Sequence, residues 1–357
     1  MSHRLILIGL ILATLVAYAP VRSAGFVYED EVYLSFAQRT LTLTDLLQPR
    51  GLTMASFGLN GWWGATPQDY HAVNLGLHLV LGLTVFGFAR TLLPVPYALT
   101  AAGLTLLHPI QTEAVAYVSG RAELIAAIGT VAAVWALSGP ATWTRAGLAF
   151  LATVFAIGGK EMGLMALPLI ALYAMVIRRV HLLAWRTVGW ALAGLGAGVA
   201  LALPILQVRV IGAIEYIMAT EQGWLGYACL QSYALLVLLG NTLLPLWLTV
   251  DHDYEVLSRT GMLMALGVLS TGLLAAWLLR RRAPVVTFGL WWMVIALAPR
   301  FIVRISELLN EHQVYTAFIG LWIALAAGLM HFNAFLTRSP KETACCSVVP
   351  PLLSSSV

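Results

Sequence analysis

Long apolar runs separated by short polar connectors dominate the hydrophobic pattern of this chain. Several runs approach the ~20 residues that a helix needs to cross ~30 Å of hydrocarbon. The pattern therefore predicts an all-α polytopic integral membrane protein with about 10–11 transmembrane helices, outer-face loops and short interfacial helices. The predicted spans lie near residues 4–20, 71–89, 96–107, 122–138, 145–157, 161–177, 187–207, 261–279, 284–299 and 314–335.

Charge predicts which connectors face the cytoplasm. With the N-terminus inside and the ten spans alternating, short inner connectors hold Arg90, Arg145, Arg178 and the arginine triplet 280–282. Basic residues concentrate on the cytoplasmic side of membrane proteins. Of the 16 acids, only Glu342 then lies inside. We therefore expect an inner or plasma membrane protein whose active site lies on the outer, periplasmic or extracellular, face.

The apolar block 229–249 is long enough to span, but Asn241 and Pro245 interrupt it. If it crossed the membrane, the triplet 280–282 would move to the outer side. We therefore expect this block to start and end outside, as a re-entrant or surface helix. Such backbone is tolerated only where protein or water satisfies its polar groups.

Composition narrows the functional classes. The chain is 60% hydrophobic and 10% charged, whereas soluble domains carry about 25% charged residues. The basic residues are scattered, which argues against a nucleic-acid partner. Three cysteines (Cys229, Cys345 and Cys346) form no disulfide framework; lipidation of the vicinal pair is a less favoured alternative to a plain tail.

The two termini carry separate expectations. The N-terminal run resembles a signal peptide, but cleavage after Ala24 would place Arg22 where a small residue is needed. An uncleaved first helix is favoured. We expect residues 1–336 to form one transmembrane domain, with 21–70 as its first outer loop, and 337–357 to be a disordered cytoplasmic tail.

The stretch "GFVYEDEVYL" places three acids, Glu29, Asp30 and Glu31, where the first span ends. One acid there could simply be a solvated helix end. Adjacent carboxylates raise one another's pKa, and a raised carboxylate is a better general base near neutral pH. This favours a catalytic interpretation of the triplet.

Further polar side chains follow near other span ends. His71, Asn74 and His78 share one helix stripe, which suits helix packing better than metal binding because no carboxylate lies on it. The loop "LLHPIQTEAVAYVSGRAEL" and the stretch "GGKEMGL" are more polar. Lys160 and Glu161 in the latter could neutralise a helix end or face a phosphate.

These motifs resemble a known family. "HPIQTEAVAYVSGRAELIAA" is similar to the signature of the membrane O-mannosyltransferases that carry tetratricopeptide repeats, within the C-type superfamily of polytopic glycosyltransferases. "FVYEDE", "GGKEMGLMALPLIALY" and "NEHQVYTAFIGLWIALA" are similar to other family segments, and the likeness covers roughly residues 20–330.

The chain also departs from the family pattern. Glu29 stands where Asp is usual, and Gln313 and Val314 stand where a basic residue and a leucine are more common. We expect a short member that lacks the repeat domain. These departures bear on the acceptor more than on the fold.

The resemblance implies transfer of a sugar, mannose in the family, from a polyprenyl-phosphate carrier to a hydroxyl acceptor, with inversion. Asp30 or Glu29 would be the base, and cations would stabilise the leaving phosphate. We expect Arg121, Lys160 and Arg50 to bind the donor phosphate. The sugar or acceptor pocket would be lined by His108, Gln111, Glu113, Glu161, Asp251, Asp253, Tyr254, Glu311 and His312.

Alternatives stay open at this stage. The acceptor could be protein Ser or Thr, a glycan or a lipid. A degenerate relative, or a non-enzymatic transporter or assembly factor, is a different class. We expect no required cofactor and no metal site, although "EDE" and "DHDY" could hold a divalent cation through oxygen ligands.

Overall fold

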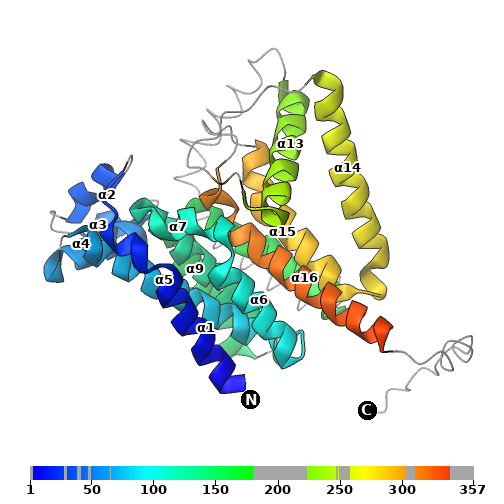
Figure 1. The fold of residues 1–357 in the computed structure, drawn as a ribbon, viewed down its shortest axis with the longest axis horizontal. Helices are drawn as coiled ribbons and strands as arrows, with labels where there is room; N and C mark the ends of the chain where they lie inside the picture. Colours follow the sequence, from blue (N-terminus) through cyan, green and yellow to red (C-terminus); the bar gives the residue numbers. More distant parts are fainter. Residues whose placement is uncertain are drawn as a thin grey trace, which may run out of the picture.

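The computed structural model describes residues 3–27, 30–37, 42–46, 50–64, 66–140, 142–179, 223–246, 248, 258–302 and 310–337. Every regular element in these ranges is a helix (Figure 1). The longer helices are α1 (His3–Ala17), α4 (Gly51–Trp63), α5 (Pro67–Ala89), α6 (Val95–Leu107), α8 (Arg121–Ala136), α9 (Trp143–Gly159), α10 (Ala166–Val176), α13 (Gly223–Leu243), α14 (Arg259–Leu278), α15 (Pro284–Ile302) and α16 (Tyr315–Leu336).

Short elements connect them at one end. These are the α-helices α2 (Asp30–Ala37), α3 (Leu43–Leu46) and α7 (Thr112–Ala116), and the 3-10 helices η1 (Ala19–Ser23), η2 (Pro109–Gln111), η3 (Val118–Gly120), η4 (Glu161–Met165) and η7 (His312–Val314). The 3-10 helix η6 (Leu279–Arg281) lies at the other end, after α14.

Seven helices in the described ranges are long and apolar enough to cross a membrane: α1 with η1, α5, α8 with η3, α13, α14 with η6, α15, and α16 with η7. The chain is thus an all-α polytopic membrane protein, as predicted. Shorter apolar helices (α6, α9, and η4 with α10) match three further predicted spans. The predicted span 187–207 and the tail beyond residue 337 lie outside the described residues.

Helix α8 is the most enclosed of these candidate spans and packs on α5, α9, α10 and α16. Helices α15 and α16 approach very closely because Gly289 and Gly320 face each other. A Cβ on either glycine would overlap the other's carbonyl oxygen. Trp292 also donates its Nε1–H to the Thr316 carbonyl at 3.0 Å. Small residues commonly permit such contacts between membrane helices.

Arginines gather at one end of the bundle, which we call the basic end. Arg145 donates to the Ala136 carbonyl at 3.1 Å, and Arg178 donates to the Gly139 carbonyl at 2.8 Å. Arg179 donates to the Arg281 carbonyl at 3.4 Å. The structure thus brings together connectors that the sequence predicts on one side of the membrane. The opposite end, where α5, α8 and α16 begin and α6, α9 and α15 end, is called the polar end.

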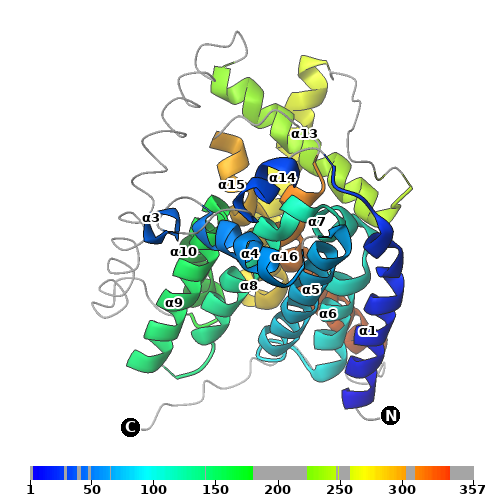
Figure 2. The ribbon, with the colours of Figure 1, turned by 90° about the vertical axis from the view of Figure 1, so that its left-hand side faces the viewer.

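Helix α13 crosses the polar end obliquely (Figure 2). Near its start, Trp224 donates Nε1–H to the Phe301 carbonyl of α15 at 3.1 Å. Near its end, the Thr242 carbonyl lies 3.0 Å from His108 Nε2, just after α6. Both ends of α13 therefore contact the same end of the bundle. Although α13 is long enough to span, these contacts agree with a surface helix that starts and ends on one side.

Candidate active site at the polar end

Asp30 is the first residue of α2 and is fully buried. Its Oδ2 accepts the Val27 N–H at 3.0 Å, which closes the turn that starts the helix. Its Oδ1 accepts the Ser119 N–H at 2.8 Å, across 89 positions of sequence. Two backbone amides thus fix the carboxylate between α2 and the η3 turn.

The surroundings of Asp30 alter its protonation. Burial raises the pKa of this carboxyl, because the charged form loses solvent. The Val27 and Ser119 amides and the nearby His71 act in the opposite direction, but they offset only part of the rise. A carboxyl with a raised pKa is a better general base near neutral pH; the catalytic role of Asp30 stays a prediction. Glu29 lies outside the described residues, and Glu31 is exposed.

Arg121 does not suit the phosphate-binding role that we predicted. It is fully buried at the start of α8. Its Nε–H donates to Asn74 Oδ1 at 2.8 Å, and its Nη2 donates to Asn60 Oδ1 at 2.9 Å and to the Tyr70 carbonyl at 3.1 Å.

The rest of the guanidinium is equally enclosed. Its Nη1 donates to the Ser56 carbonyl at 3.1 Å, and its central carbon lies 4.3 Å from the Phe57 ring centroid. A lipid phosphate could reach this cation only if α4, α5 and α8 moved apart. Arg121 instead joins those three helices.

The other two predicted cations are paired with acids. Arg50 binds Glu161 through two hydrogen bonds of 2.9 and 3.0 Å and also donates to the Tyr33 hydroxyl. Lys160 donates to Glu123 Oε1 within an ion pair whose two side chains are largely buried. An ammonium group has three donors, so Lys160 retains hydrogens for a further acceptor.

A third acid–base pair joins α7 to η7. Glu113 accepts the His312 N–H at 2.7 Å and lies 2.8 Å from His312 Nδ1. The Tyr117 ring lies 5.8 Å from the His312 ring. The structure therefore brings together Glu113 and His312, which are 199 positions apart. Glu311 is buried beside them.

His108 and Gln111 precede Glu113 in the sequence. His108 stacks on Trp322 at 4.6 Å between ring centroids, and its Nδ1 accepts the Ile110 N–H at 3.2 Å. Burial lowers the pKa of His108, although the Thr242 carbonyl partly opposes the shift. The Gln111 amide is fully buried and has no hydrogen-bond partner on either side-chain atom. An unsatisfied buried amide marks a place for a polar ligand or water.

Two residues of the helix stripe on α5, His78 and Asn74, join neighbouring segments, which agrees with the predicted packing role. His78 Nε2 lies 3.1 Å from the Leu106 carbonyl and Nδ1 contacts the Tyr315 hydroxyl, while Asn74 binds Arg121 and the 115–118 turn. Among the described residues, no group of three or more His, Cys, Asp or Glu side chains could hold a metal ion. Asp251, Asp253 and Tyr254 lie outside the described residues.

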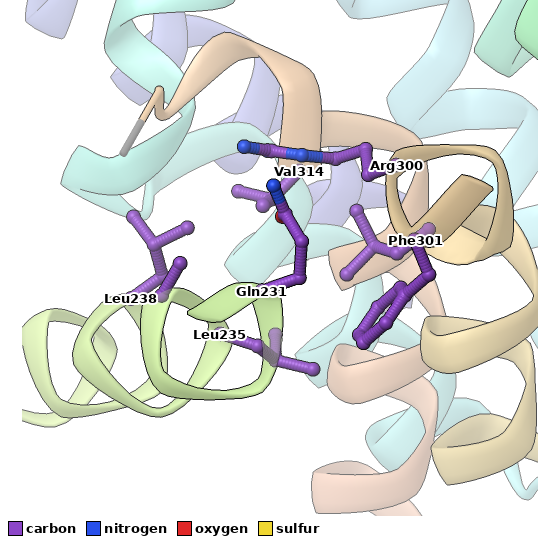
Figure 3. A pocket seen from close by; sticks show the side chains of 8 residues that line it. Gln231, Leu235, Leu238, Arg300, Phe301 and Val314 are labelled. Atoms are coloured by element: carbon purple, nitrogen blue, oxygen red, sulfur yellow. The ribbon is translucent and has the colours of Figure 1, made fainter. Parts of the chain in front are cut away.

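A residue that the sequence interpretation missed is Arg300. It lines a small pocket with Gln231 at one side and mostly apolar walls elsewhere (Figure 3). The pocket lies where α13 crosses the end of α15 and the start of α16, and its other lining residues are Ala234, Leu235, Leu238, Leu297, Phe301 and Val314. An arginine directly after an apolar span, on the predicted outer side, was the available signal.

Part of the chain is similar in sequence to known proteins. The protein O-mannosyl-transferase Tmtc1 of Drosophila melanogaster is 37% identical over 135 residues. The protein O-mannosyl-transferase Tmtc2 of the same organism is 35% identical over 189 residues. The chain is similar to protein O-mannosyl-transferases. The resemblance predicted from its motifs is thereby confirmed.

The matches are partial. They cover 32% and 44% of this chain, and 16% and 20% of the two fly proteins. The mouse protein O-mannosyl-transferase TMTC3 is 30% identical over 141 residues, which is 15% of its length. The matched part of the chain thus spans at most a fifth of these relatives. No protein-family model matches the chain.

Proposed function

We propose that this protein transfers a sugar, mannose in the first instance, from a polyprenyl-phosphate carrier to a hydroxyl group of protein Ser or Thr. The observation that carries the proposal is the buried carboxylate of Asp30. It is held by the amide of Ser119, within the segment that most resembles the O-mannosyltransferase signature. The names of the relatives support the same chemistry.

In the proposed step the acceptor hydroxyl gives its proton to Asp30 as its oxygen attacks the anomeric carbon. The bond between that carbon and the phosphate oxygen breaks, and the polyprenyl phosphate leaves with the electron pair. Attack opposite the leaving group inverts the anomeric centre. The Val27 and Ser119 amides and the Ser119 side chain orient the carboxylate. Because Asp30 is fully buried, the acceptor hydroxyl would reach it only where α2 and η3 move apart.

Cations would stabilise the charge that grows on the leaving phosphate. Lys160 is our candidate because Glu123 holds its ammonium at the polar end while two of its hydrogens remain for a ligand. The pocket beside Arg300 places a guanidinium next to hydrocarbon walls, but it would have to open before the junction of a phosphate and a prenyl chain could enter. Arg50 binds both oxygens of Glu161, the residue after Lys160, and would support the proposed phosphate site there.

The setting of the proposed reaction follows from charge. The arginine-rich end faces the cytoplasm under the positive-inside rule, so the polar end would lie on the periplasmic or extracellular face. Buried Gln111 and the partly exposed Glu113 and His312 would line the acceptor or sugar pocket. We expect no metal requirement; loss of transfer in chelator with recovery in magnesium would contradict that.

A transfer assay tests the proposal. Purified protein in nanodiscs is given radiolabelled polyprenyl-phosphate mannose and a Ser/Thr-containing acceptor, and Asp30→Asn is compared with wild type. We expect a loss of about 10²–10⁴-fold, the usual contribution of a general base. The matched control is Glu31→Gln, an exposed acid on the same helix, which should keep full activity.

The destination of the label separates the acceptors: label in protein supports the proposal, and label only in glycan or lipid assigns the acceptor to that class. If Asp30→Asn stays folded and transfers at the wild-type rate, Asp30 is only the cap of α2. If wild type consumes no donor with several sugars, the enzyme proposal fails and transport assays follow.

A further inference from the structure

A chain of hydrogen bonds leads from the fully buried Arg121 to Asp30 through one amide side chain. Arg121 donates Nε–H to Asn74 Oδ1 at 2.8 Å, so the carboxamide oxygen faces the guanidinium. The amide nitrogen of Asn74 must then point the other way. It lies 3.1 Å from the Tyr117 carbonyl and 3.2 Å from the Val118 carbonyl.

The backbone that Asn74 holds is the turn that presents the Ser119 amide. Val118, Ser119 and Gly120 form η3, and the Ser119 N–H is the donor to Asp30 Oδ1 at 2.8 Å. The turn has little freedom, because a Cβ on Gly120 would overlap the Ala114 carbonyl oxygen. The position of the Ser119 amide thus depends on the carbonyls on its N-terminal side.

We propose that Asn74, oriented by Arg121, is a positioning residue for Asp30, because its carboxamide fixes the η3 turn that donates to the carboxylate. This inference rests on the proposed role of Asp30 as the base. Asn74 does not contact the reacting groups. Its effect passes through the Ser119 amide, which binds the charged form of Asp30 and thereby favours that form.

The chain offers a matched control in Asn60. Its Oδ1 accepts from the same guanidinium at 2.9 Å, but its Nδ2 donates to the Gly64 carbonyl at 3.0 Å, away from η3. Asn74→Asp and Asn60→Asp therefore place the same new carboxylate against Arg121. Only the first removes the donors that hold the 115–118 carbonyls.

The other charged groups near Asp30 are accounted for among the described residues. Helix α2 packs on α4 and η3. The charged residue next to α4 is Arg50, which is paired with Glu161. The charged residue next to η3 is Arg121. His71 of α5 interacts electrostatically with Asp30. Neither asparagine variant removes any of these charges.

The first test measures the pH dependence of kcat/KM and of kcat for wild type, Asn74→Asp, Asn74→Leu and Asn60→Asp. For both Asn74 variants we expect kcat at neutral pH to fall about 10- to 100-fold, as for a misplaced catalytic group. The acid limb of the pH profile should move to higher pH in both Asn74 variants, because the Asp30 carboxylate loses a hydrogen-bond donor. Asn60→Asp should keep the wild-type limb. An equal shift in Asn60→Asp, or a shift in Asn74→Asp without one in Asn74→Leu, would show an effect of added charge and overturn the proposal.

The second test does not need activity. Infrared difference spectra, wild type minus Asp30→Asn, report the protonation of the Asp30 carboxyl against pH. The midpoint should rise in both Asn74 variants even if the protein transfers no sugar, and an unchanged midpoint in folded protein would contradict the inference. If wild type itself transfers no sugar but the midpoint still rises in both Asn74 variants, only the proposed function fails and the positioning role of Asn74 stands. If both Asn74 variants fail to fold, Ser119→Pro removes the same N–H together with the side-chain hydrogen bond of Ser119. Its midpoint should rise further than that of Ser119→Ala, which loses only the side-chain bond.

Discussion

The two ends of the helical bundle use arginine in opposite ways. At the basic end, Arg178 and Arg179 are exposed and donate to carbonyls at helix ends. At the polar end, Arg121 is fully buried and donates to two amides and two carbonyls. An exposed charge keeps its solvation, whereas a buried one must recover it from the protein.

The energetic cost of burying charged side chains therefore falls at the polar end. Buried charges are expensive even when well paired, and ionisable residues within membrane proteins commonly mark functional sites. The polar end contains Asp30, Arg121, the Lys160–Glu123 pair and the Glu113–His312 pair. The basic end requires only solvated cations that orient the chain. Four expected outcomes test this contrast between the two ends.

The largest effect is expected on stability. Arg121→Leu would leave the Asn60 and Asn74 oxygens and two carbonyls without their donor, at roughly 3 kcal/mol or more of unfolding free energy. Arg178→Leu at the basic end should cost less than about 0.5 kcal/mol, as exposed substitutions usually do. Denaturant unfolding in one detergent measures both, and equal costs would erase the contrast between the ends.

A smaller effect is expected on donor affinity. Lys160→Met removes the ammonium that we propose for the phosphate, so KM for the lipid-linked donor should rise about tenfold, equivalent to ~1.4 kcal/mol. Lys160→Arg keeps the positive charge and should recover part of the affinity. Donor titrations of the three proteins decide this point. If Lys160→Met lowers only thermal stability, the lysine serves the ion pair alone.

The pH dependence follows from Asp30. Its pKa is raised by burial, so the base loses its negative charge at a higher pH than an ordinary Asp with pKa near ~3.9. Transfer should therefore fall as pH decreases through this raised pKa. For folding the sign is opposite: the contribution of Asp30 is fully present below the unfolded-state pKa and is lost as pH rises through the folded-state pKa. Asp30→Asn should flatten the stability profile in that window, and an unchanged profile would argue against a buried, protonatable carboxyl.

The smallest effect is expected at the basic end. Replacing Arg280, Arg281 and Arg282 by Gln should leave transfer by correctly inserted protein within about twofold of wild type, because these side chains lie at the end of the bundle opposite the site and such substitutions usually contribute little. Their charge should matter for insertion instead, which labelling of a single introduced cysteine from each side can measure. A tenfold loss of transfer would show that the two ends are coupled.

Much of the helical framework could be predicted from the sequence. The predicted spans 71–89, 122–138 and 314–335 correspond to α5, α8 and α16 within a few residues, because length and hydrophobicity determine what can cross a bilayer. Charge on the connectors predicted which helix ends lie together, and the contacts of Arg145, Arg178 and Arg179 agree. The candidate acids and cations also came from the sequence.

What each polar side chain does was decided only by the tertiary structure. Arg121 follows a polar loop in sequence, yet α4 and α5 enclose it. Asp30 and Ser119 are 89 positions apart, and Glu113 and His312 are 199 apart, yet each pair is hydrogen-bonded. Arg300 stands beside a pocket that exists only because α13 crosses α15 and α16. Hydrophobicity acts on each segment by itself, whereas solvation, pairing and protonation depend on neighbours that the fold brings from other parts of the chain.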